Sequence, residues 1–160
     1  MIKNFLVTFL AHADSGARKV VIATAAIMAA VVSAQVVMRY VFNGSFDWAD
    51  EISRLAFVTT IFIAIPLGIR DGTHVSIDIF VAKFPAPLGG IVQRATYLIA
   101  GLMLLLVAWT AINVAGVTWN ERMGAINITS AVFFFPIIVG ALHSALHLLQ
   151  MAADPETPIP

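Results

Sequence analysis

Long stretches without a charged residue are the feature that most constrains how this chain can fold. Residues 20–38, 55–69, 95–120 and 123–153 contain no Asp, Glu, Lys or Arg. The first, third and fourth stretches supply the roughly 20 residues that a helix needs to cross the hydrocarbon core of a bilayer. The second covers only about 22 Å at the helical rise of 1.5 Å per residue, so its helix must borrow a turn from residues 51–54.

The overall composition excludes most soluble classes of protein. Hydrophobic residues make up 60% of the chain and charged residues only 11%, whereas about 25% is usual in soluble domains. A water-soluble protein with such a surface would aggregate. The net charge of zero offers no basic surface for nucleic acid.

Motifs for catalysis are also missing from the sequence. The absence of cysteine excludes disulfides, thiolate metal sites, iron–sulfur clusters and a cysteine nucleophile. No nucleophile–base pair, phosphate-binding loop or dinucleotide fingerprint is recognisable. We therefore expect a membrane protein that is not an enzyme.

These features predict an all-α membrane protein with one domain over residues 1–153 and a disordered, proline-bearing tail over 154–160. The four transmembrane helices are expected near residues 18–42, 52–70, 94–119 and 126–149. Lys and Arg favour the cytoplasmic side of a membrane. Six of them fall on the side of the N-terminus and three on the other side, which predicts cytoplasmic termini: Lys3, Arg18, Lys19, Arg70, Lys83 and Arg94 against Arg39, Arg54 and Arg122.

The residues before the first predicted span allow two interpretations. Lys3, a short apolar stretch and Ala11-His12-Ala13 resemble a signal peptide that ends in a small-residue cleavage site. The apolar stretch is at the lower limit of length for that purpose. We expect instead an interfacial amphipathic turn that leads into the first span.

The connector over residues 45–57 is strongly patterned. Ser45 is a candidate N-cap, and acidic residues follow in the first turn, where the helix dipole favours them. One face of the predicted helix carries the charges and another carries apolar anchors: Asp47, Asp50, Glu51 and Arg54 against Trp48, Ile52 and Leu55. Such a helix lies at the membrane surface or bends into the second span. It is either a solvated entrance with a tryptophan anchor or a docking face for a partner.

The connector over residues 71–84 is the second amphipathic segment. His74 and Asp78 are four residues apart and would lie side by side on a helix, although the alternation of apolar and polar residues also fits a strand. An unpaired strand edge is not tolerated within hydrocarbon. We therefore predict a short interfacial helix on the cytoplasmic face.

Polar residues within the spans are sparse. No Asp, Glu, Lys or Arg lies in the middle of a predicted span, which argues against a proton relay. Sodium can bind hydroxyls and backbone carbonyls, so the absence of acids does not exclude sodium. His143 and His147, four residues apart, raise the possibility of haem or zinc. Two ligands on one helix face cannot hold opposite sides of a haem, and zinc needs a third and a fourth ligand. We expect no cofactor and no metal in this chain.

Signals for helix packing are stronger than signals for chemistry. Ala26, Ala30 and Ala34 recur every four residues, which lets another helix approach closely. Trp109 lies near the middle of the third span, away from the interfacial belt where tryptophan is usual. Residues 133–135, three consecutive phenylalanines, add a large apolar patch to the fourth span. We expect some of these residues to fill the core of the four helices and the rest to form a large protein–protein contact within the bilayer.

An ordered set of short motifs resembles one known family. The motifs are Arg39-Tyr40 after the first span, Trp48 and Glu51 with Arg54 before the second, and Gly68-Ile-Arg70 followed by residues 72–78, which include His74 and Asp78. Over residues 18–150 the chain resembles the small membrane subunit, of DctQ or SiaQ type, of tripartite ATP-independent periplasmic (TRAP) transporters.

The resemblance implies a function in transport. Such subunits pair as a heterodimer with a large membrane subunit, which binds substrate and sodium and moves by an elevator mechanism. A periplasmic binding protein delivers a carboxylate, such as a C4-dicarboxylate or a sialic acid, and contacts the complex transiently. This implies a multi-pass protein of the bacterial inner membrane, bound by lipids, that acts as a scaffold. By position, the resemblance and the span pattern assign anchoring or interface roles to Arg39, Tyr40, Trp48, Glu51, Arg54, His74, Asp78 and Trp109.

Two other functions are alternatives to this one. A haem-carrying membrane anchor of a respiratory enzyme would use His143 and His147. A small homo-oligomeric exporter would also have four helices per subunit, but we expect no membrane-embedded acid in the first span of this chain.

Overall fold

The computed structural model describes residues 2–71 and 86–153 of the chain, with side chains described over 8–71 and 88–153. Over these ranges the protein is helical and contains no β-strand. The elements in chain order are α1 (Ile2–Val41), α2 (Ala49–Arg70), α4 (Ala86–Val117), the 3₁₀ turns η1 (Thr118–Asn120) and η2 (Ser130–Phe133), and α5 (Phe134–Ala153).

Four of the described helical segments are long and apolar enough to cross a membrane: Thr8–Val41, Ala49–Arg70, Leu88–Asn120 and Ser130–Ala153. This confirms the predicted fold class of an all-α protein with four membrane-spanning helices. The short interfacial helix expected over residues 71–84 falls almost wholly outside the described residues.

Helix α1 begins much earlier than the first predicted span. It is continuous from Ile2 to Val41, so the residues that we expected to form a separate interfacial turn belong to the same helix. The charged residues at its start do not end it, because Asp14 is buried against other helices while Arg18 and Lys19 are exposed.

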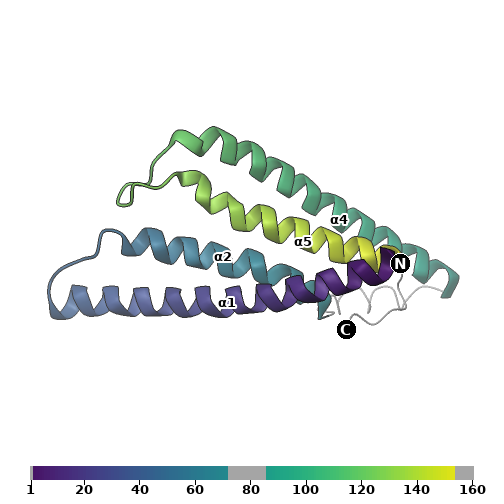
Figure 1. The fold of residues 1–160 in the computed structure, drawn as a ribbon, viewed down its shortest axis with the longest axis horizontal. Coiled ribbons are helices and arrows are strands. Elements are labelled where there is room, and N and C mark those ends of the chain that lie inside the picture. Colours follow the sequence, from purple (N-terminus) through teal and green to yellow (C-terminus); the bar gives the residue numbers. More distant parts are fainter. Residues whose placement is uncertain (1, 72–85, 154–160) are drawn as a thin grey trace.

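The helices lie side by side in the order α1, α2, α5, α4 (Figure 1). Helices α1 and α2 are antiparallel, as are α4 and α5, whereas the two middle helices α2 and α5 run parallel (Figure 1). The α1–α2 and α4–α5 connectors lie at one end of the molecule, which we call the connector end. The start of α1 meets the last turns of α5 at the opposite end.

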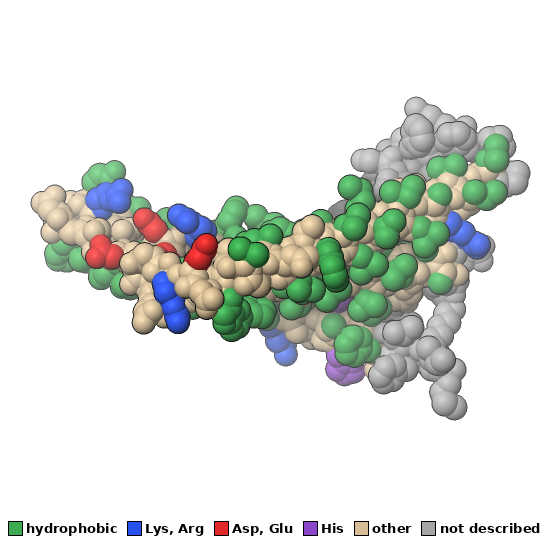
Figure 2. All heavy atoms as spheres, turned by 90° about the horizontal axis from the view of Figure 1, so that it is seen from above, with side chains coloured by type: hydrophobic (Ala, Val, Ile, Leu, Met, Phe, Trp, Pro, Cys, Tyr) green, Lys and Arg blue, Asp and Glu red, His purple; other side chains and the backbone are tan. Residues whose placement is uncertain are grey.

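A row of helices leaves much apolar surface uncovered. None of the most apolar 18-residue window of α1 is buried inside the protein, compared with a third of the corresponding window of α5. Hydrophobic side chains accordingly spread over the surface seen in Figure 2. Since lipid tails and apolar protein surfaces can both cover such side chains, this surface suits a membrane and a membrane-embedded partner.

The α1–α2 connector shows how α1 ends. Asn43 has a positive φ of 49°, and the Gly44 N–H donates to the Met38 carbonyl at 3.1 Å, an arrangement that satisfies the last carbonyls of a helix. Our expectation of Ser45 as the N-cap of the next helix was wrong. Helix α2 begins at Ala49, and Trp48 occupies the cap position without a side-chain hydrogen bond.

Prolines occupy different positions in α2 and α5. Pro66 lies inside α2, whereas Pro136 is the third residue of α5. Pro136 lies in the first turn of α5, directly after the 3₁₀ turn η2, and the first turn of an α-helix tolerates proline. We therefore do not interpret Pro136 as a kink.

Helices α2 and α5 pack most closely at Gly140. This glycine is buried, and a Cβ atom placed on it would collide with the backbone carbonyl of Phe62 in α2. Because backbone cannot move aside as a flexible side chain does, the contact requires glycine.

We expect Gly140→Ala to destabilise the protein by about 1–3 kcal/mol through this overpacking. Gly116→Ala in α4 is the matched control, since nothing lies within 4 Å of its added methyl group. Thermal unfolding of both variants in detergent measures the difference. Equal stability of the two variants would contradict the close packing of α2 on α5.

Candidate functional site

The predicted anchoring residues of the α1–α2 hairpin gather at the connector end. Arg39 and Tyr40 lie in the last turn of α1, and Tyr40 is 78% exposed. Trp48 and Arg54 are exposed as well, and the ring of Trp48 lies 5.3 Å from that of Phe46. These side chains are therefore accessible to a partner or to the membrane interface.

A groove runs between α1 and α2 beside these residues. Its polar lining comprises Gln35, Arg39, Tyr40, Asp50 and Ser53, and valines of α1 complete it. Gln35 also fixes the adjoining connector, because its side-chain oxygen accepts a hydrogen bond from the Phe46 N–H at 3.0 Å. The groove thus combines charge, hydroxyl and apolar surface at one site.

Glu51 forms hydrogen bonds with a part of the chain that is distant in sequence. Its two carboxylate oxygens accept hydrogen bonds from the N–H groups of Ala125 and Ile126, each at 2.8 Å. Glu51 lies in the first turn of α2, and its partners lie in the α4–α5 connector. The carboxylate therefore joins the two helical hairpins at the connector end.

The α4–α5 connector is itself held by a dense set of hydrogen bonds. The Thr129 hydroxyl donates to the Trp119 carbonyl at 2.7 Å, and the Ser130 N–H donates to the Glu121 carbonyl at 2.8 Å. The Met123 N–H donates to the Ile128 carbonyl at 3.0 Å. These hydrogen bonds give the connector a defined conformation. The sequence had suggested that the last span begins near residue 126, whereas α5 begins at Phe134.

Trp109 lies on the outer surface of α4 and is 66% exposed. It forms part of an exposed apolar stripe with helical spacing, consisting of Leu98, Leu102, Leu105, Trp109 and Ile112. The ring therefore faces away from the other helices of this chain. His74 and Asp78, the remaining predicted anchoring residues, lie outside the described residues.

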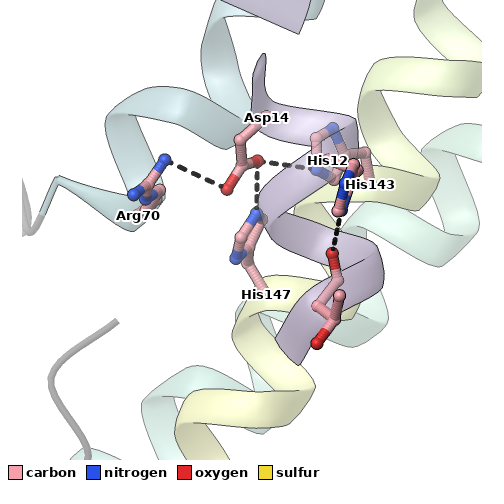
Figure 3. A network of polar contacts seen from close by, with 6 residues as sticks. His12, Asp14, Arg70, His143 and His147 are labelled. Atoms are coloured by element: carbon pink, nitrogen blue, oxygen red, sulfur yellow. Dashed lines mark hydrogen bonds and ion pairs between the residues drawn. The ribbon is translucent and has the colours of Figure 1, made fainter. Parts of the chain in front are cut away.

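A buried polar cluster lies near the opposite end of the molecule (Figure 3). Asp14 of α1 is only 2% exposed, and its Oδ1 atom lies 2.9 Å from the Nε2 atoms of both His143 and His147 of α5. Its other oxygen, Oδ2, lies 3.4 Å from Nη1 of Arg70 in α2. One carboxylate therefore joins three helices.

Sequence reasoning missed this cluster because it placed Asp14 before the first span. A signal was present in the spacing of the residues of α1. The buried residues in this part of α1 are Leu10, Asp14 and Ala17. They lie on the same face of the helix as Thr24, which comes later in the chain. The Thr24 hydroxyl contacts that of Thr60 in α2 at 2.8 Å. Following this face backward from Thr24 would have placed Asp14 against the other helices. His12 points elsewhere, and its Nδ1 atom lies 2.8 Å from the Thr8 carbonyl.

These features define a multi-pass membrane protein with long apolar outer faces and polar groups that join its helices. The family model described as the DctQ component of tripartite ATP-independent periplasmic transporters matches residues 28–156. The match covers most of the chain, and the protein belongs to this family.

Individual relatives agree with the family match. Two Haemophilus influenzae proteins described as TRAP transporter small permease proteins are 26% and 28% identical to this chain. The alignments cover 72% of this chain and 70% of the first relative, and 89% of this chain and 89% of the second. A Vibrio cholerae protein named as the C4-dicarboxylate TRAP transporter small permease protein DctQ is 29% identical over 48% of this chain and 34% of its own length.

Family membership confirms several expectations from the sequence. Small permease subunits are components of transporters and are not enzymes. The family and the four apolar helices support a multi-pass location in the inner membrane. The family also implies a large membrane subunit and a binding protein as partners. Asp14 precedes the matched residues, so the family match carries no information about its role.

We expect Glu51→Gln to loosen the α4–α5 connector. A glutamine side chain has one acceptor oxygen, so one of the two N–H groups loses its partner at a cost of about 1–3 kcal/mol. Hydrogen–deuterium exchange at Ala125 and Ile126 should therefore become faster. Asp50→Asn, at the exposed neighbouring acid, is the matched control and should leave this exchange unchanged. Unaltered exchange in Glu51→Gln would contradict the proposed link.

Proposed function

We propose that this chain is a non-catalytic scaffold subunit of a sodium-coupled secondary importer of carboxylates that depends on a periplasmic binding protein. The observation that carries the proposal is the open row of helices, whose outer faces remain apolar and uncovered. A large membrane subunit seated against these faces would be braced by the row.

The polar contacts between helices support a scaffold role for this chain. Glu51 and Asp14 are engaged with groups of this same chain, and Thr24 and Thr60 contact each other across α1 and α2. These interactions stabilise the arrangement of the helices. Sodium and substrate are then bound by the large subunit, which moves by an elevator mechanism against this fixed row.

The substrate class rests on the family and on one relative. The Vibrio cholerae relative is named for C4-dicarboxylate transport, and the resemblance noted from the sequence extends the class to sialic acids. Both are carboxylates, and a binding protein delivers them from the periplasm. The selective residues belong to the other chains of the complex.

The distribution of positive charge suggests which end meets the binding protein. Lys and Arg are more frequent on the side of the N-terminus, which favours cytoplasmic termini. The connector end then faces the periplasm, because both helical hairpins turn there (Figure 1). Arg39, Tyr40, Trp48 and Arg54 would be available for docking, and Glu51 would hold the adjoining α4–α5 connector in place.

Uptake into proteoliposomes tests this function. The large membrane subunit, reconstituted together with this chain and supplied with the binding protein and a sodium gradient, should import a carboxylate. The large subunit alone should import little. Uptake by this 160-residue chain alone, or full uptake by the large subunit without it, would overturn the proposal.

We expect Trp109→Ala to weaken association with the large subunit, because its exposed ring offers a large contact area on α4. The thermal stability of the isolated chain should change little, since the ring is not part of its core. Trp109→Phe retains an aromatic ring and should preserve most of the association. Co-purification from membranes measures the effect. Loss of stability without loss of co-purification would place the ring in an internal role instead.

A further inference from the structure

Buried polar atoms without a hydrogen-bond partner are concentrated at one place in the described part of the chain. They are His143 Nε2, Ser144 Oγ, His147 Nδ1 and Gln150 Oε1, and all lie within residues 143–150 of α5. Buried polar atoms are nearly always satisfied by protein, by water or by an ion. One of them, His143 Nε2, lies 2.9 Å from Oδ1 of Asp14, which points to a group bound between these side chains.

The geometry around Asp14 fits a metal ion. A carboxylate oxygen of Asp14 and one ring nitrogen each of His143 and His147 all lie within 4.8 Å of one another. Tetrahedral zinc has bonds of about 2.0–2.1 Å to nitrogen and oxygen, which places its ligand atoms roughly 3.3 Å apart. The observed separation of 2.9 Å between Oδ1 and each Nε2 requires only a small expansion.

The ligand types also agree with zinc and related metals. Imidazole nitrogen and carboxylate oxygen are common zinc ligands. Histidines at i and i+4 share one helix face, as in known zinc-binding helices. Asp14, from α1, supplies the third ligand, whose apparent absence led us to expect no metal from the sequence.

Arg70 is suited to the position next to such a site. Its Nη1 atom lies 3.4 Å from Oδ2 of Asp14, which leaves Oδ1 turned toward both histidines (Figure 3). Carboxylates that bind metals are usually held by a neighbour in this way. Asp14 would then bind through a single oxygen.

A cluster of direct hydrogen bonds is the alternative explanation. It accounts well for His147, whose Nε2 atom forms a hydrogen bond with Oδ1. It accounts less well for His143, because Nε2 lies 2.9 Å from the same oxygen yet has no hydrogen-bond partner of acceptable geometry. A metal ion bound between the three side chains would give this nitrogen a partner.

We propose that Asp14, His143 and His147 bind a divalent transition metal ion of the zinc class, with a fourth position open to water. The ion would link the N-terminal part of α1 to α5, two helices that are not neighbours in the row. This proposal goes beyond the scaffold function and does not depend on it.

Direct metal analysis tests the site. The full-length chain is purified from membranes with any partner that accompanies it, using an affinity tag without histidine, and is stripped with a chelator. After dialysis against Zn²⁺, elemental analysis should find about one zinc ion per chain. Substitution by Co²⁺ should give the visible absorption bands of a tetrahedral or five-coordinate site, and Zn²⁺ should raise the thermal midpoint of unfolding.

Three variants and one control locate the binding. Asp14→Asn, His143→Gln and His147→Gln should each weaken zinc binding by at least about tenfold, since even loss of an outer-shell partner costs 10–100-fold. His12→Gln, which removes a histidine of α1 that contacts the Thr8 carbonyl instead, should bind zinc as the unaltered protein does.

Two results would overturn the proposal. One is the absence of stoichiometric zinc and of cobalt absorption bands in the unaltered protein. The other is unchanged zinc affinity in all three ligand variants. If a ligand variant fails to fold, the cobalt spectrum and the zinc-dependent thermal midpoint of the unaltered protein still decide the question. Neither result bears on carboxylate uptake, so the scaffold function is tested separately.

Discussion

A carboxylate buried among membrane helices must be matched by partners, because an isolated charge there is costly. Asp14 meets this requirement with Arg70 from α2 and with His143 and His147 from α5. The interaction fixes where α1 crosses the other helices. Removing one partner would leave the rest of the buried group uncompensated, so the three helices are coupled at this point.

Glu51 has the corresponding position at the connector end, where its carboxylate holds two backbone N–H groups of the α4–α5 connector. Between the two carboxylates, α2 and α5 approach closely at Gly140. Helix association within lipid gains little from the hydrophobic effect and depends on packing and hydrogen bonds. These contacts therefore explain how an open row of helices keeps its shape while its outer faces stay apolar.

The residues that hold the helices together differ from the residues that are exposed on the outside of the protein. Glu51 and Asp14 act within the chain, whereas Tyr40, Trp48 and Trp109 remain exposed. The proposed role as a brace requires this separation, because the helices of a brace must keep their arrangement when a neighbouring subunit moves. Membership in the DctQ family implies a large membrane subunit as a partner. The exposed stripe of α4 and the exposed small residues Ala26, Ala30 and Ala34 of α1 are the surfaces that such a partner would contact in the proposed complex.

Sequence alone determined the class of the protein, because the length and spacing of apolar runs are local properties of the chain. A bilayer core requires an apolar helix long enough to cross it, so these runs indicate the spans directly. The four spans and the family followed from residues 18–150. Tertiary structure decided the rest. It showed that α1 extends to Ile2, that Glu51 bonds to a connector 74 residues away in sequence, and that Asp14 meets His147 across 133 residues. Such pairings depend on which helices become neighbours. The spacing of residues in α1 indicates which of its faces is buried, but it does not identify the partners on the other helices.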